Sequence, residues 1–153
     1  MRRPFGSLLA AALVTLLCVQ HAQAQQAAAP QKLTFSGDMV LWAFTVPPDK
    51  TADYEQVLAK LKAALQKLDT PEAKQQLAGW KVIKNSAAQP DGSILYIHVI
   101  SPVVKDADYT ISQIVYTAFP DPKERNAFYE LYKGSVKANL FTIQAPIVAD
   151  FSK

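Results

Sequence analysis

Four short segments of the chain are rich in apolar, β-branched and aromatic residues and are bounded by turn-forming residues. They are 38–46 (DMVLWAFTV), 80–85 (WKVIKN), 94–101 (ILYIHVIS) and 140–145 (LFTIQA). Apolar runs of this length with such boundaries indicate β-strands. The intervening 89–93 (QPDGS) has strong turn chemistry, so the second and third segments are expected to form an antiparallel hairpin. Residues 147–151 are a candidate extension of the last strand beyond Pro146.

The intervals between these segments carry apolar residues at helical spacing. In 49–68 the stripe consists of Tyr54, Val57, Leu58, Leu61, Leu65 and Leu68. This pattern predicts an amphipathic helix, with Asp49 or Thr51 as its cap. A second, short helix is expected to begin at Thr70-Pro71 and to end at Gly79, because Pro suits the first position and Gly the end of a helix.

The region 109–119 is ambiguous. Its residue types favour a strand, but Ile111, Ile114, Val115 and Ala118 keep helical spacing. We favour a helix, with Asp108 as its cap. The following Asp121-Pro122 is a clearer helix start, and this last helix is expected to end at Gly134 or to run on to Ala138.

The order of elements is therefore β-α-β-β-α-β, with each helical interval divided in two. This order predicts an α+β fold of the ferredoxin-like, split βαβ type: a four-stranded antiparallel sheet with helices on one face. The other face needs a cover as well, because 39–46 and 94–101 carry no charged residue except the ionisable His98, and both of their faces are apolar. Exposed apolar patches mark interfaces or ligand grooves. We therefore expect a homodimer through the sheet face.

At the level of element order and two-faced strands, residues 36–146 resemble the dimeric α/β-barrel proteins. In that group two sheets pack face to face and close a barrel, in some cases around a small ligand. The string from Ile100 to Tyr109 (ISPVVKDADY) and the Asp150-Phe151 ending also resemble small exported bacterial proteins of unknown function. The second resemblance implies export but no activity.

The start of the chain looks like a signal peptide. Arg2 and Arg3 precede an apolar run at 8–19, and Ala22-Gln23-Ala24 offers a small-x-small cleavage pattern. The alternative, a retained membrane anchor, is disfavoured because the run is shorter than the ~20 residues that span a bilayer. We expect a signal peptide at 1–24, a flexible linker at 25–35 and a single domain at 36–153. The protein would then be secreted or periplasmic, with no transmembrane segment after cleavage.

Removal of this signal peptide would change the net charge and the cysteine and histidine content of the mature chain. Without Arg2 and Arg3 there are 14 basic and 13 acidic residues, so the net charge falls from +3 to +1. Such a balance argues against a nucleic-acid partner. Cys18 and His21 leave with the leader, so the expected mature chain has no thiol and one imidazole, and we predict neither a metal site nor a cofactor.

His98 is the one remaining candidate for acid–base chemistry. Tyr96 stands two residues earlier on the same face of its strand, and Trp42 and Phe44 can line the same space. An apolar wall with a His and a Tyr suits a small ligand. The alternative is that His98 is a partly buried histidine that is hydrogen-bonded in a dimer interface.

These observations support two functional hypotheses, and a structural component of the envelope with no ligand is a third possibility. The favoured one is a non-catalytic, exported protein of the cell envelope that binds a small apolar ligand or a protein partner. The alternative is a cofactor-free dimeric α/β-barrel enzyme acting on a small apolar molecule, with His98 as the acid/base group and Tyr96 as its partner.

Overall fold

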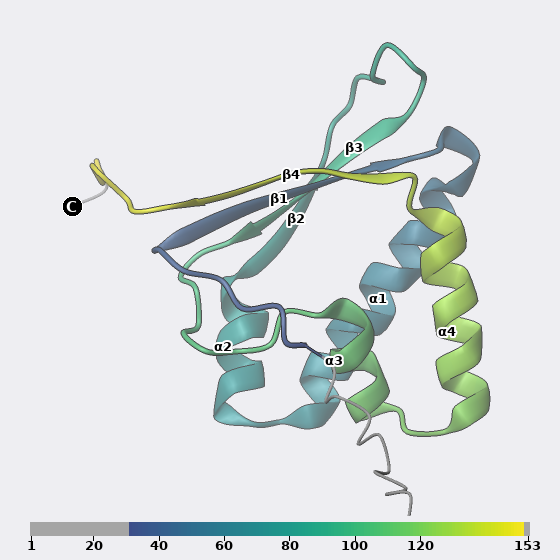
Figure 1. Cartoon of the computed structure of the whole chain (residues 1–153), viewed down its shortest axis with the longest axis horizontal. Helices are drawn as coiled ribbons and strands as arrows, with labels where there is room; N and C mark the ends of the chain where they lie inside the picture. Colours follow the sequence, from purple (N-terminus) through teal and green to yellow (C-terminus); the bar gives the residue numbers. More distant parts are fainter. Residues whose placement is uncertain (1–30, 152–153) are drawn as a thin grey trace, which may run out of the picture. The chain divides into compact units, whose positions relative to one another are not determined.

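Four antiparallel strands form one sheet in the order β2-β3-β1-β4 (Figure 1). The computed structural model describes residues 31–151. The strands are β1 (Met39–Val46), β2 (Trp80–Lys84), β3 (Ile94–Ile100) and β4 (Ala138–Ala145). All four predicted strands are thus confirmed, and β2 and β3 form the expected hairpin. The α+β class and the four-stranded antiparallel sheet follow; residues 147–151 are not a strand.

The helices lie together on one side of the sheet (Figure 1). They are α1 (Thr51–Leu68), α2 (Pro71–Gly79), α3 (Ile111–Ala118) and α4 (Pro122–Ser135), and a short 3-10 turn, η1 (Pro48–Lys50), precedes α1. We call the sheet side that they cover the helix face, and the opposite side the open face. Within residues 31–151, no helix has the length and apolar character needed to cross a membrane.

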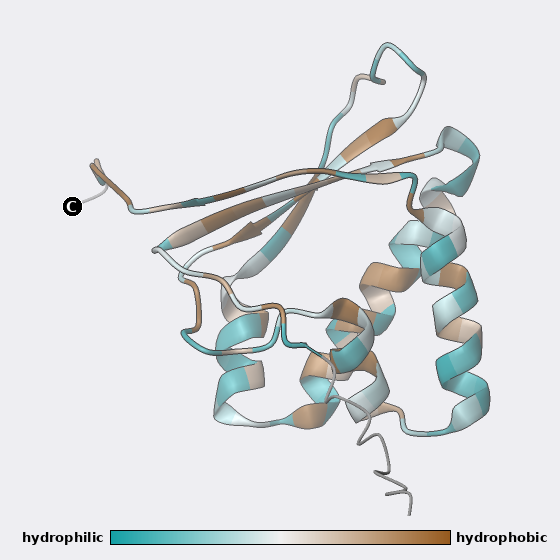
Figure 2. Cartoon of the chain, in the orientation of Figure 1, coloured by the Kyte–Doolittle hydropathy of each residue, from teal (hydrophilic) through white to brown (hydrophobic). Residues whose placement is uncertain are grey.

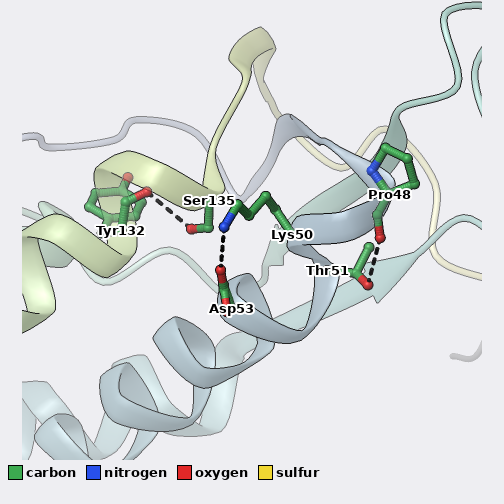
Figure 3. Close-up of polar contacts among 6 residues, drawn as sticks. All are labelled: Pro48, Lys50, Thr51, Asp53, Tyr132 and Ser135. Carbon is green, nitrogen blue, oxygen red and sulfur yellow. Dashed lines mark hydrogen bonds and ion pairs between the residues drawn. The ribbon is translucent and has the colours of Figure 1, made fainter.

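The start of α1 differs from the expectation. Neither Asp49 nor Thr51 caps it: the cap position is Lys50, which makes no side-chain capping bond. Instead the Thr51 hydroxyl donates to the Pro48 carbonyl at 3.3 Å, and Lys50 pairs with Asp53 at 3.0 Å (Figure 3). The turn imposed by η1 has already started the chain on its helical path, so no capping side chain is required at this end.

The ambiguous region after β3 is a helix, as we favoured. Its capping residue is Thr110, however, and not Asp108. The Asp108 carboxylate accepts from the backbone N–H of Thr110 at 2.9 Å and from that of Leu33 at 3.2 Å. Asp108 therefore joins the start of the described chain to the loop before α3.

Leu33 and Phe35 belong to the packed unit, although both fall within the predicted linker. Phe35 is buried, and the carbonyl of Leu33 accepts from Tyr109 N at 2.8 Å. The chain from Lys32 onward forms one contact unit. The predicted signal peptide and most of the predicted linker lie outside the described residues.

The start of α4 matches the prediction and provides a first test. The Asp121 carboxylate accepts from the backbone N–H groups of Lys123 and Glu124, both at 3.0 Å. We expect Asp121→Ala to lower the free energy of unfolding by about 1 kcal/mol, since two helix-end donors lose their partner. Urea unfolding measures the loss. Asp121→Asn keeps an acceptor oxygen and should remain close to wild type; an equal loss in both variants would contradict a capping role.

Candidate functional site

His98 lies at the centre of an aromatic cluster on the helix face. It comes from the middle of β3 and is fully enclosed. The rings of Trp42, Phe44, Tyr54 and Trp80 pack around it, with centroids 5.2–6.3 Å from the imidazole. Side chains from β1, β2 and α1 thus fill the space around the histidine.

Both nitrogens of the His98 ring are hydrogen-bonded. Trp80 Nε1 donates to His98 Nδ1 at 2.9 Å, and the Tyr54 hydroxyl lies 2.7 Å from His98 Nε2. An indole N–H can only donate, so Nδ1 must be the unprotonated nitrogen. The proton of the neutral ring is then on Nε2, which donates to the Tyr54 oxygen. Trp80 therefore determines the tautomer of His98.

The surroundings keep this imidazole uncharged. Burial lowers the pKa of His98 from 6.5 to about 3. Burial also raises the pKa of the Tyr54 hydroxyl. A second proton on His98 would place an N–H on Nδ1 against the Trp80 N–H, so protonation would also break that bond. At neutral pH the Tyr54–His98–Trp80 chain is a neutral network in which both imidazole nitrogens are hydrogen-bonded.

Tyr96 and the other predicted site residues lie on the same side of the sheet. Tyr96 is buried beside Tyr54, and its hydroxyl donates to Glu55 Oε1 at 2.8 Å, not to His98. Lys84 Nζ bonds the same oxygen at 2.9 Å. Hydrogen bonds from Lys84 and Tyr96 lower the pKa of Glu55. The structure thus brings Trp42, Phe44, Tyr96 and His98 together, beneath the helices and away from the open face.

The open face carries an apolar patch that crosses the whole sheet. Strand register aligns its side chains in two rows. One row consists of Ile83, Ile97, Ala43 and Phe141, and the next consists of Lys81, Val99, Leu41 and Ile143. Ile83, Phe141 and Ile143 are 53%, 37% and 49% exposed, and the larger apolar residues of β1 and β3 in these rows are half-buried. The charged residue in the two rows, Lys81, stands on the edge strand β2.

Strand β4 turns its apolar side away from the helices. Phe141 and Ile143 share the open face with Ala43 and Leu41, whereas Thr142, opposite Trp42, lies on the helix-face side. A strand at the edge of an isolated domain normally points its apolar side toward the core. Figure 2 shows the hydrophobic colouring along β4 and into the segment after it. The apolar side of β4 therefore faces the open side of the sheet, as in a strand that packs against a core on that side.

A separate apolar recess lies on the helix side of the sheet. It has a volume of about 300 Å³. Its lining residues come from α1, α2 and β2 and are Leu58, Leu61, Lys62, Leu65, Leu77, Trp80 and Val82. This is near the lower end of the range for small-molecule sites. The expected small apolar ligand would fit here better than beside His98, where side chains occupy the space.

Sequence reasoning missed two parts of this arrangement. The open-face residues Phe141 and Ile143 have a signal in the alternation of apolar and polar residues in LFTIQA. The partners of His98 have no such signal, because Tyr54 and Trp80 are 44 and 18 positions away and their contact depends on how α1 and β2 pack.

Comparison with known proteins adds no relative: no family model, no curated protein and no solved structure matches this chain.

Proposed function

We propose that this chain is a non-catalytic interaction domain that associates with a second copy of itself through the open face. The single observation that carries this proposal is that β4 presents its apolar residues Phe141 and Ile143 on the open face, where they extend the patch formed by β1 and β3. A large apolar patch on a small domain favours association. The order β2-β3-β1-β4 is consistent with a ferredoxin-like fold, and we assign that fold as part of the proposal.

The place of action belongs to the same proposal. The Arg2-Arg3 start, the apolar run and Ala22-Gln23-Ala24 support export to the cell envelope.

The geometry favours this function over the alternative enzyme. A barrel closed by two open faces would enclose Leu41, Ile97 and Phe141, whereas His98 lies on the opposite side of the sheet. An acid/base group must reach the proton that it transfers. His98 is enclosed, and both of its nitrogens are already bonded within the protein. We therefore assign it a structural role.

A charge at the centre of the open face tests the proposal. Ile97 lies between Ile83 and Ala43, and it is half-buried. We expect Ile97→Lys to raise the dimer dissociation constant at least a hundredfold, because an ammonium group would be buried without a partner. Sedimentation velocity over a dilution series measures the constant.

Gln75→Lys is the matched control, since it adds the same charge at an exposed position on α2. It should leave the dimer unchanged. A wild-type chain that stays monomeric at high concentration would overturn the proposal, as would a dimer that tolerates Ile97→Lys.

A further inference from the structure

The segment 146–151, which we call the arm, continues from β4 past the end of the sheet (Figure 1). Val148 and Phe151 in the arm are 95% and 98% exposed, and Ile147 is 48% exposed. Large apolar side chains at this level of exposure are costly in water. They make the arm a second stretch with exposed apolar side chains, directly continuous in sequence with the strand that carries Phe141 and Ile143.

The base of the arm is held firmly by the domain. Asp38 N donates to the Ala145 carbonyl at 3.1 Å, and the Asp38 carboxylate accepts from Ile147 N at 3.0 Å. One residue earlier, the Gln144 side-chain oxygen accepts from the N–H and the hydroxyl of Ser36, at 2.6 and 3.0 Å. Four hydrogen bonds from the 36–38 segment therefore fix the direction in which the arm leaves β4.

Gly37 makes this close approach feasible. Its φ is +84°, and a Cβ atom at this position would lie 2.9 Å from the Ala145 carbonyl oxygen. A residue with a side chain would therefore have to be strained and would also push β4 away. The turn before β1 thus packs closely against the end of β4, at the point where the arm begins.

The arm's own domain does not cover its apolar side chains. Ile147 and Val148 line a hollow at the end of the sheet with Gly37, Asp38 and the 101–103 segment, yet Val148 remains almost fully exposed. The described chain offers one large apolar surface that is likewise uncovered, which is the open face. The direction fixed by Asp38 carries the arm beyond its own β1, so the open face of another copy is the matching surface.

We propose that the arm of each copy packs Val148 and Phe151 onto the open face of a second copy, in a reciprocal exchange. This inference rests on the proposed self-association and adds the segment that secures it. In a two-fold dimer every such contact is made twice. Each copy therefore places two apolar side chains of its arm on the open face of the other copy. The arm then supplies contacts near the edge of the patch, while the rows through Ile97 and Leu41 supply its centre.

Sedimentation velocity on the exported protein, without the predicted signal peptide, tests this proposal with point variants in the arm. We expect Phe151→Asp and Val148→Asp each to raise the dimer dissociation constant roughly thirtyfold, the usual scale of an interface anchor. Phe151→Leu keeps an apolar side chain and should change it less than threefold. Because both side chains are exposed in the single chain, thermal unfolding of the dilute variants should match that of wild type, which separates lost association from lost folding.

The outcomes distinguish the arm from the dimer itself. A wild-type dimer that Ile97→Lys disrupts but Phe151→Asp and Val148→Asp leave intact would overturn the arm exchange and keep the self-association. A wild-type monomer would overturn both. A dimer weakened by the aspartate variants and preserved in Phe151→Leu would support the exchange.

Discussion

Acidification from pH 7 to pH 4 should lower the free energy of unfolding by about 3 kcal/mol through His98 alone. The folded-state pKa is about 3 and the ordinary value is 6.5. Between these values the unfolded chain binds a proton at His98 and the folded chain does not. The contribution of His98 to the free energy of unfolding is therefore fully present above pH 6.5. It falls as the pH drops below 6.5 and stops changing below pH 3.

The variant His98→Gln isolates this effect. Its amide can accept from Trp80 and donate to Tyr54 but cannot take up a proton. Urea unfolding at half-unit pH steps should give the wild type a slope steeper by about 1.4 kcal/mol per pH unit between pH 6 and 4. The carboxylates, including the Glu55 group whose pKa is lowered, contribute equally to both proteins and cancel in the difference. Parallel curves would show that His98 is accessible to protons in the folded state.

The buried network explains why a histidine is tolerated inside the core. An unpaired imidazole nitrogen in this position would carry a desolvation cost of about 1–3 kcal/mol. Trp80 and Tyr54 supply one partner for each nitrogen, and no buried side-chain polar atom among the described residues lacks a partner. The same pairing removes the two properties that catalysis requires, an accessible nitrogen and a pKa near neutrality.

Local signals predicted most of the elements of this fold. Apolar runs and turn residues located all four strands, and the Thr70-Pro71 and Asp121-Pro122 pairs located two helix starts. These signals act within a few residues, so they can be read along the chain. The two cap assignments that were wrong, at α1 and α3, have different causes. At α1 a preceding turn starts the helix, and before α3 the backbone N–H groups of Leu33 and Thr110 occupy the Asp108 carboxylate.

The orientation of the sheet was beyond the reach of local patterns. In β1 and β3 both faces are apolar. The two-residue period of a strand shows which residues share a face, but not which face the helices cover. The choice depends on long-range contacts, such as that of Tyr54 in α1 with His98 in β3. The pattern therefore predicts that Trp42, Phe44, Tyr96 and His98 share one face of the sheet. It does not predict that the helices cover this face.

The two faces of the sheet are thereby assigned different roles. The helix face stabilises the single chain, because its β1 side chains, from Val40 to Val46, are at most 6% exposed. The open face contributes less to that stability, because its large residues keep contact with water. Phenylalanines on opposite faces, Phe44 and Phe141, offer a matched pair for separating these roles.

Phe44→Ala should lower the free energy of unfolding by about 3–5 kcal/mol, whereas Phe141→Ala should lower that of the single chain by less than about 1 kcal/mol. Phe44 is 3% exposed and contacts the rings of Trp42, Tyr54 and His98, so its truncation leaves a cavity that these rings cannot fill. Phe141 is 37% exposed on the edge strand, where water enters the vacated space. Urea unfolding at low protein concentration measures both.

The two alanine variants should rank in the opposite order when the dimer dissociation constant is measured. Phe141→Ala is expected to weaken the proposed dimer, because it removes an aromatic side chain from the row that contains Ile97 and Ile83. Phe44→Ala, assayed where it is still folded, should leave the dissociation constant unchanged, since helices and not a partner cover that side. Equal effects of the two truncations on unfolding would mean that the open face is already covered in the single chain, and the interface would then have to lie elsewhere.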